Sequence, residues 1–103
     1  METFKIEKRY SNDILIEGEA ESFKEFVIKN KLNLRGSNLR GSNLRDSDLS
    51  GSDLRGSNLS DADLSDADLS DSDLSDSDLS YCKIKASQKE RLLEALHIII
   101  EED

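Results

Sequence analysis

The sequence predicts a mainly β fold in which the middle of the chain forms a square, coiled tube. Three observations lead to this prediction. Leucine recurs every five residues, a small residue stands two positions before almost every leucine, and Gly or Asp stands two positions after almost every one. Neither a helix nor a flat strand has a period of five, so the chain must change direction once in each unit.

The leucine series begins at Leu34, ends at Leu79 and is continued by Ile84, without a gap. On an α-helix, a step of five residues turns each leucine by about 140° from the one before it, so the leucines would scatter around the helix. A coiled-coil seam needs an average spacing of about 3.5 residues. On a flat strand, an odd period would send successive leucines to opposite faces. These three structures are therefore excluded.

A chain that turns a corner in each unit satisfies the period. Three extended residues place the leucine and the small residue on the inside, with the Asn or Asp between them on the outside. The other two residues make the corner, where Gly or Asp accepts the dihedral angles of a tight turn. Each side is about 10 Å long, and four sides enclose a space that leucines can fill. We therefore expect about 20 residues per coil, about 2.75 coils, and stacking of residues one coil apart.

Residues 32–86 resemble the pentapeptide-repeat family, whose consensus is A(D/N)LXX, through units such as GSNLR, DSDLS, GSDLR and DADLS. The resemblance implies a right-handed quadrilateral β-helix with four units per coil. The sequence departs from the family pattern by placing Ser where Ala is usual, and Leu32 begins the small-residue column with a large side chain. An unpaired buried hydroxyl costs about 1–3 kcal/mol, so we expect the turn carbonyls to accept hydrogen bonds from these serines.

Residues 1–31 are expected to cover the first coil, because an open end would expose leucines and unpaired strand edges. Two alternating runs, Phe4/Ile6 and Ile14/Ile16, are separated by the turn residues 11–13, which predicts a β-hairpin. Residues 22–25 read SFKE and fit the S-x-x-E capping box, so a helix is expected over about residues 22–30. The flanks of the repeat also resemble those of bacterial and phage members of the family.

Residues 87–103 are the second expected cover. Ser87 can cap a helix that runs through about residue 100, and one apolar stripe follows it: Leu92, Leu93, Leu96, Ile99 and Ile100. The stripe predicts packing against the last coil. An alternative is a contact between two copies of the chain, which Ile98 favours because it lies off the stripe. The residues of that possible dimer contact are Leu92, Leu96, Ile98 and Ile99.

Length and composition favour one structural domain made of the segments 1–31, 32–86 and 87–103. Cys82 is the only cysteine, so no disulfide framework is expected. No apolar run reaches the roughly 18 residues of a membrane span. The N-terminal METFKIEKRY has no apolar signal-peptide core. We therefore expect a cytoplasmic protein without membrane contact, present as a monomer or as a homodimer through a terminal cap.

Charge is concentrated in the second half of the repeat. The chain has a net charge of −9, and residues 46–80 contain eleven Asp and one Arg. We call residues 46–80 the acidic block, and we expect the part of the tube that they form to be acidic on all sides. The candidate surface for a protein partner consists of four corner aspartates and four side aspartates: Asp61, Asp66, Asp71 and Asp76, and Asp63, Asp68, Asp73 and Asp78. A solvated face that keeps the tube soluble is the simpler interpretation.

Two further interpretations of the charge remain open. Some members of the resembled family mimic DNA and bind type II topoisomerases such as gyrase. The acidic block exceeds the charge density of DNA, which is one charge per about 1.7 Å of axis, but the topoisomerase-binding members are longer and dimeric. The regularity of residues 56–80 also fits an idealised or engineered repeat array without natural activity. Direct nucleic-acid binding is not expected, because the acidic block would repel a phosphate backbone.

The residues that could take part in catalysis or metal binding do not form a known motif. The pair Asp61/Asp63 invites a calcium interpretation, but an EF-hand loop counted from Asp61 would have Asp66 and Ser72 where Gly and Glu are required. We expect His97 to be a cap residue and Cys82 to fill an inward slot. No catalytic residue, metal ligand or cofactor is predicted, and the leading interpretation is a non-enzymatic structural or protein-interaction module.

Overall fold

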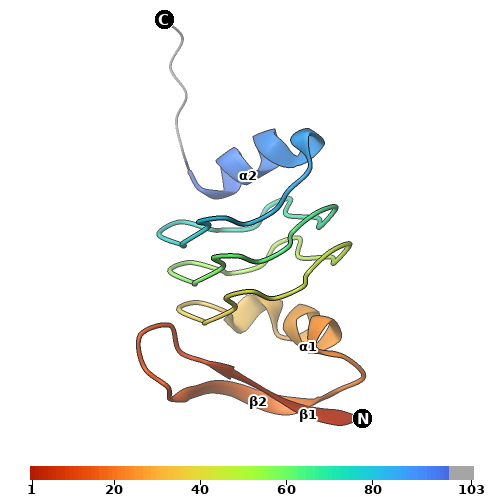
Figure 1. The fold of residues 1–103 in the computed structure, drawn as a ribbon, viewed down its shortest axis with the longest axis vertical. Coiled ribbons are helices and arrows are strands. Elements are labelled where there is room, and N and C mark those ends of the chain that lie inside the picture. The colour runs from red at the N-terminus through yellow and green to blue at the C-terminus, as the bar shows by residue number, and fades with distance from the viewer. Residues whose placement is uncertain (98–103) are drawn as a thin grey trace, which may run out of the picture.

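The computed structural model describes residues 1–97. Its elements are β1 (Glu2–Glu7), β2 (Ile14–Ala20), α1 (Phe23–Lys29), the short 3-10 helix η1 (Lys31–Asn33), the repeat region, a second 3-10 helix η2 (Ala86–Gln88) and α2 (Lys89–Ala95). The β1–β2 hairpin and α1 lie at one end of a stack of coils, and α2 lies across the other end (Figure 1). Within the described part of the chain, no helix has the length and apolar character needed to cross a membrane.

The repeat region returns to the same side of the tube once in every four units. Parallel bridges join residues 20 positions apart, and their pairs are Asn38–Asn58, Asn43–Asp63, Asp48–Asp68, Asp53–Asp73, Asn58–Asp78 and Asp63–Lys83. Backbone hydrogen bonds follow the same spacing; the N–H of Leu39, for example, donates to the carbonyl of Asn58 over 2.8 Å. The predicted stacking of residues one coil apart is confirmed.

The chain bends at the same position in every unit. The bend residues have φ angles between 58° and 70°, and they are Gly36, Gly41, Asp46, Gly51, Gly56, Asp61, Asp66, Asp71, Asp76 and Tyr81. At the second of these bends, the N–H of Ser42 donates to the carbonyl of Leu39 over 3.1 Å, which closes a β-turn with the positive φ at its third residue. Gly and Asp tolerate this conformation better than most residues, so the predicted corners are confirmed.

Leucines fill the tube. They are at most 3% exposed from Leu34 through Leu74, and Leu79 and Ile84 on the last coil are partly buried. Burial of each leucine contributes about 1.5–3 kcal/mol. The inward placement expected for Leu32 is wrong: this side chain is 68% exposed, because Leu32 belongs to η1 rather than to an extended side.

The inward serines behave in two ways. Hydroxyls of one group donate to the turn carbonyl three residues earlier over 2.5–2.6 Å, in the pairs Ser47–Leu44, Ser72–Leu69 and Ser77–Leu74. Within residues 1–97, the buried hydroxyls of Ser37, Ser52 and Ser57 have no partner, and the turn carbonyl of each accepts only the backbone N–H of the serine. The predicted partner is therefore correct for the first group and wrong for the second.

The N-terminal cover forms as predicted. Strands β1 and β2 pair antiparallel, with Ile6 opposite Ile16. The side chain of Ser22 accepts a hydrogen bond from the N–H of Glu25 over 3.1 Å and caps α1. Phe26 of α1 is fully buried, and its ring lies 5.8 Å from that of Phe4 on β1. Helix α1 thus lies between the hairpin and the first coil (Figure 1).

The end of the hairpin is tied to the tube through Arg9. Its N–H donates to the carbonyl of Gly36 over 2.8 Å. Its guanidinium donates to the carbonyls of Gly56 and Asp76 over 3.1 Å each. These three carbonyls belong to corners that stack one coil apart, so the backbone and the side chain of this one residue together contact three corners along one edge.

The C-terminal cover differs from the prediction. Helix α2 ends at Ala95 instead of near residue 100, because His97 adopts a left-handed φ of 59°. Ser87 lies in η2 and does not cap α2, whose first turn follows Gln88. Residues 98–103 lie outside the described residues, and with them Ile98, Ile99 and Ile100 of the predicted stripe.

Gln88 ties the start of the C-terminal cover to the tube, whereas α2 itself has no side-chain hydrogen bond at its N-cap. Its side-chain oxygen accepts from the N–H groups of Lys85 and Asp66 over 2.8 and 2.9 Å. Its side-chain nitrogen donates to the carbonyls of Leu64 and Ala67 over 2.8 and 3.0 Å. The Gln88 amide thereby provides hydrogen-bond partners for backbone groups that have no further coil stacked on them.

The unpartnered serines yield a stability prediction. Ser52→Ala and Ser57→Ala should each raise the free energy of unfolding by about 1–2 kcal/mol, because each removes a buried hydroxyl without a hydrogen bond. Ala62 and Ala67 already occupy equivalent slots. Urea unfolding followed by circular dichroism measures the change.

Ser47→Ala is the matched control. It removes a made hydrogen bond and should lower the free energy of unfolding by up to about 1 kcal/mol. Equal destabilisation by all three variants would show that the buried hydroxyls are satisfied.

Candidate interaction surface

The eight candidate aspartates form two groups with different backbone positions. The corner group, Asp61, Asp66, Asp71 and Asp76, has left-handed φ angles and is exposed. The side group, Asp63, Asp68, Asp73 and Asp78, occupies the ladder positions between the inward residues.

Each side aspartate folds back onto its own chain. The N–H of Ser70 donates to Oδ1 of Asp68 over 3.0 Å, and the Ser70 hydroxyl donates to the same oxygen over 2.6 Å. Asp73 and Asp78 make the same pair of bonds with the serines two residues ahead. Such Asx turns are local structural features, and the neutral Asn58 makes the same bonds to Ser60.

These hydrogen bonds stabilise the ionised carboxylates. The hydroxyl and N–H of Ser70 lower the pKa of Asp68, and the corresponding serines lower the pKa values of Asp73 and Asp78. The side chain and backbone of Ser65, followed by Arg45, lower the pKa of Asp63 to about 2. The side group is therefore fully charged at neutral pH.

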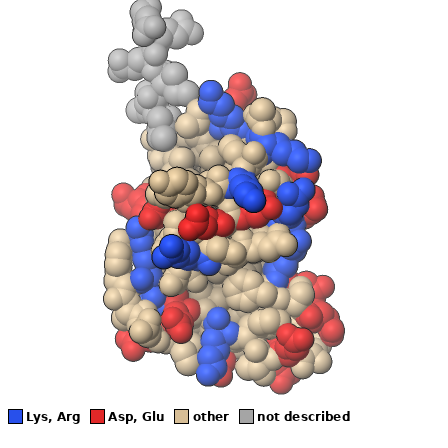
Figure 2. Space-filling view, viewed as in Figure 1, with Lys and Arg blue, Asp and Glu red and all other residues tan. Residues whose placement is uncertain are grey.

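Cations from neighbouring coils pair with several of these aspartates. Arg40 lies 3.6 Å from Asp61, and Arg45 lies 3.2 Å from Asp63. Lys85 pairs with Asp66. On the face shown in Figure 2, basic and acidic side chains alternate over the coils. The expectation of a tube that is acidic on all sides is therefore wrong, because stacking brings cations of other coils beside the carboxylates.

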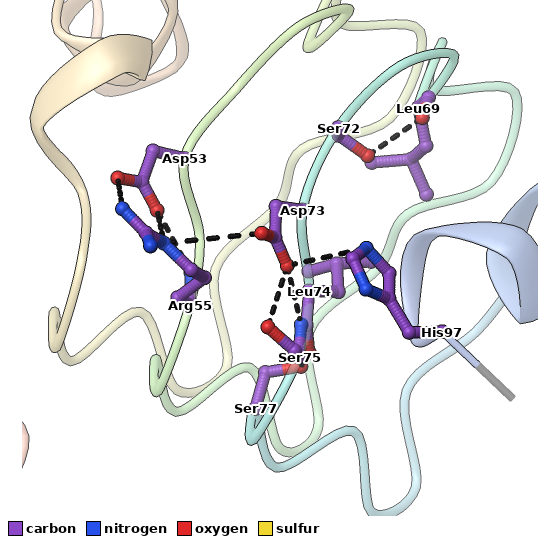
Figure 3. Close-up of polar contacts among 9 residues, drawn as sticks. All are labelled: Asp53, Arg55, Leu69, Ser72, Asp73, Leu74, Ser75, Ser77 and His97. Carbon is purple, nitrogen blue, oxygen red and sulfur yellow. Dashed lines mark hydrogen bonds and ion pairs between the residues drawn. The ribbon is translucent and has the colours of Figure 1, made fainter.

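Asp73 lies in the most crowded of these clusters. Arg55 binds both oxygens of Asp53 through Nε and Nη2 over 2.9 and 2.8 Å, and its Nε lies 3.8 Å from Asp73. His97, which follows α2, lies 3.7 Å from the other oxygen of Asp73 (Figure 3). This cluster joins two coils to the C-terminal cover, so Asp73 has a structural role.

One side of the tube is neutralised only in part, because Lys85 pairs with Asp66 and Lys31 lies 3.7 Å from Asp48. Asp66, Asp68 and Asp71 stand at a corner, the middle and the next corner of this side, and Asp46 and Asp48 stand one coil below. We call these five residues the acidic face. In the part of the chain that the structure describes, neither Asp68 nor Asp71 is within ion-pair distance of a cation. Asp48 acts against the hydrogen bonds of Asp68 by raising its pKa, as expected for like charges paired across a ladder.

Two of the four residues of the possible dimer contact lie against the core. Leu92 of α2 and Leu96, which follows α2, are partly buried against the core cluster, whereas Ile98 and Ile99 lie outside the described residues. Burial raises the pKa of the Cys82 thiol, which disfavours the reactive thiolate. Among residues 1–97, no group of three His, Cys, Asp or Glu side chains could hold a metal ion.

The sequence did not predict the contacts that Arg9 and Gln88 make with the tube, because neither residue belongs to a periodic pattern.

The lowered pKa values predict a stability loss in acid. Above the ordinary pKa of 3.8, the side aspartates are ionised in both states and their native hydrogen bonds stabilise the fold. Stability should fall as the pH drops below that value and, for Asp63, continue to fall to about pH 2. Thermal unfolding midpoints at a series of pH values measure this loss.

Asp63→Asn tests the cause of the acid dependence. Asn can accept the Ser65 N–H, as Asn58 does from Ser60, but does not titrate. The variant should lose less stability between pH 3.8 and pH 2 than the wild-type chain. A wild-type acid profile in this variant would contradict the assignment, and Asp71→Asn serves as the exposed-corner control.

The repeat sequence matches a known protein family. The pattern of the family described as Pentapeptide repeats matches residues 30–61 and 57–87, with eight copies. The matched residues make up more than half of the chain and include the whole acidic face. No curated protein and no solved structure matches the chain. On the family match and the five-residue corner geometry, the chain belongs to the pentapeptide-repeat family.

Proposed function

We propose that this protein is a non-enzymatic protein-interaction module that binds a basic protein surface through its acidic face. In this proposal residues 32–86 form a right-handed quadrilateral β-helix of about 2.75 coils, with residues 1–31 and 87–103 as covers. The observation that carries the proposal is the pair Asp68 and Asp71 beside Asp66, on one side of a regular ladder: among the described residues, no cation lies within ion-pair distance of Asp68 or Asp71. A second row, Asp46 and Asp48, lies below it.

The geometry of Asp68 supports binding of a cation. Both hydrogen bonds from Ser70 end on Oδ1, and they fix the orientation of the carboxylate. In the described structure, Oδ2 accepts no hydrogen bond and is available to a Lys or Arg of a partner. A charge held in place before binding loses little conformational entropy when the partner arrives, which favours affinity.

The overall charge supports the same type of partner. A net charge of −9 attracts basic surfaces and repels acidic ones. Charge complementarity of this kind mainly increases the association rate and is weakened by salt. We therefore expect a basic partner whose binding is strongest at low ionic strength.

The DNA-mimicking alternative has less support. A mimic of duplex DNA needs continuous negative charge, whereas Arg40, Arg45 and Arg55 each pair with an aspartate on the surface. The chain should therefore leave DNA supercoiling by gyrase unchanged at micromolar concentrations. Inhibition or drug protection at those concentrations would favour the alternative.

A capture experiment tests the proposed face. The wild-type chain and the variant Asp68→Asn/Asp71→Asn are immobilised and exposed to host-cell extract at low salt. Asn keeps the Asx turn at position 68, as Asn58 shows, so the variant should fold and should lose at least roughly tenfold in affinity for the captured basic protein. The affinity is then measured with the purified partner.

Asp61→Asn/Asp63→Asn is the matched control. It changes the net charge by the same amount but alters aspartates that already pair with Arg40 and Arg45. Binding retained by this control and lost by the acidic-face variant would locate the site. Equal losses of affinity in both variants would show that binding depends only on net charge and would refute a binding site on the acidic face.

A further inference from the structure

A hollow lies at the end of the tube opposite α2, between the hairpin loop and the first corner. Its volume is about 330 Å³. Three of its lining residues are cations, Lys8, Arg9 and Arg35, and Tyr10 and Leu15 contribute aromatic and aliphatic surface. A basic concave site contrasts with the net charge of −9 of the chain.

Arg35 differs from the other arginines of the repeat. Arg40, Arg45 and Arg55 each lie within 3.6 Å of an aspartate. The partner of Arg45 stands 18 residues ahead of it, and the residue in the same relation to Arg35 is Asp53. Both oxygens of Asp53 are held by Arg55.

The unit that contains Arg35 also lacks a carboxylate of its own. Asn33 occupies the side position that Asp53 occupies in the unit of Arg55. Within residues 1–97, neither Arg35 nor Lys8 is in ion-pair distance of a carboxylate. These two cations border the same hollow, and although the charge of Arg35 helps to lower the pKa of Asp53, Arg35 forms no ion pair in this part of the chain like those of the other arginines of the repeat.

Arg9 and Tyr10 give the hollow a rigid wall. Nη1 of Arg9 is held by the carbonyls of Gly56 and Asp76, and its guanidinium lies 4.8 Å from the centre of the Tyr10 ring. Tyr10 is nevertheless 87% exposed, so its ring does not serve the core. A flat, apolar group could stack beside this pair.

We propose that the hollow binds a small organic anion, a carboxylate or a phosphate that carries a flat apolar group. Lys8 and Arg35 hold the anionic group, and Tyr10 and Leu15 contact the apolar group. Charge-assisted hydrogen bonds from guanidinium and ammonium groups are the usual means of binding such anions. A volume of about 330 Å³ is at the lower end of the range for small-molecule sites, which matches a ligand with one ring.

Titration with phenyl phosphate and with benzoate, followed by ¹⁵N NMR, tests the site. At least one of them should saturate and should shift the backbone N–H signals of Tyr10, Ser11 and Gly36, with weaker binding as salt is added. Inorganic phosphate and benzyl alcohol separate the contributions of charge and ring, and each should bind more weakly. Shifts spread over the whole chain, or equally strong binding of benzyl alcohol, would overturn the proposal.

Two glycine corners provide a matched pair of variants. Gly36 lines the hollow and Gly41, the next corner, does not. Both have a φ of +70°, and an added Cβ would meet nothing within 4 Å at either position. Asp adopts this conformation at other corners, so both variants should fold.

Gly36→Asp places a carboxylate beside Arg35 and should weaken binding by roughly tenfold or more, whereas Gly41→Asp should leave it unchanged. Equal effects of the two variants would refute the site. Arg35→Gln and Arg45→Gln repeat the comparison by removing a cation inside and outside the hollow. The acidic-face variant Asp68→Asn/Asp71→Asn should bind the anion normally, so this proposal and the proposed function can fail separately.

Discussion

The left-handed corner at every fifth residue is the constraint on which the rest of this structure depends. Because each corner residue has a φ near 60–70°, the chain turns after every three extended residues and the leucines from Leu34 through Leu74 meet inside. The same turn brings residues 20 apart into parallel register, which satisfies the backbone through the ladder. It also places each outward Asn or Asp over the N–H two residues ahead. Core, ladder and surface therefore have one geometric cause.

The periodic features could be predicted from the sequence because each repeats a local rule. Leucine spacing, corner residues and the stacking interval follow from the five-residue unit, and the Ser22 cap follows from a four-residue motif. The features that were missed involve single side chains and distant partners. Arg9 reaches carbonyls 47 and 67 residues away, and Gln88 reaches one 24 residues away. No pattern near Arg9 or Gln88 in the sequence indicates such contacts.

The candidate surface was predicted less completely than the fold, for a related reason. The number of aspartates can be read from the sequence, but their neutralisation depends on which cations the stacking brings near. Arg45 pairs 18 residues ahead and Arg40 pairs 21 residues ahead, so both pairs become predictable only after the coil length is known. The same spacing explains why Arg35 forms no ion pair within residues 1–97: the carboxylate 18 residues ahead of it, Asp53, is bound on both oxygens by Arg55.

The charge of the acidic block is separable from the fold that carries it. At the corners, Gly and Asp adopt the same conformation, and a Cβ at the glycines would meet no atom within 4 Å. On the sides, Asn38, Asn43 and Asn58 accept the same backbone hydrogen bond as the aspartates. A neutral version of the tube would thus keep its corners, ladder and core. Like charges one coil apart, as at Asp48 and Asp68, repel each other, although the Ser70 hydrogen bonds outweigh this repulsion and lower the pKa of Asp68. Asp73 uses its charge to join two coils to the C-terminal cover, whereas Asp68 and Asp71 have no such structural contact among the described residues, which supports the binding role proposed for their charge.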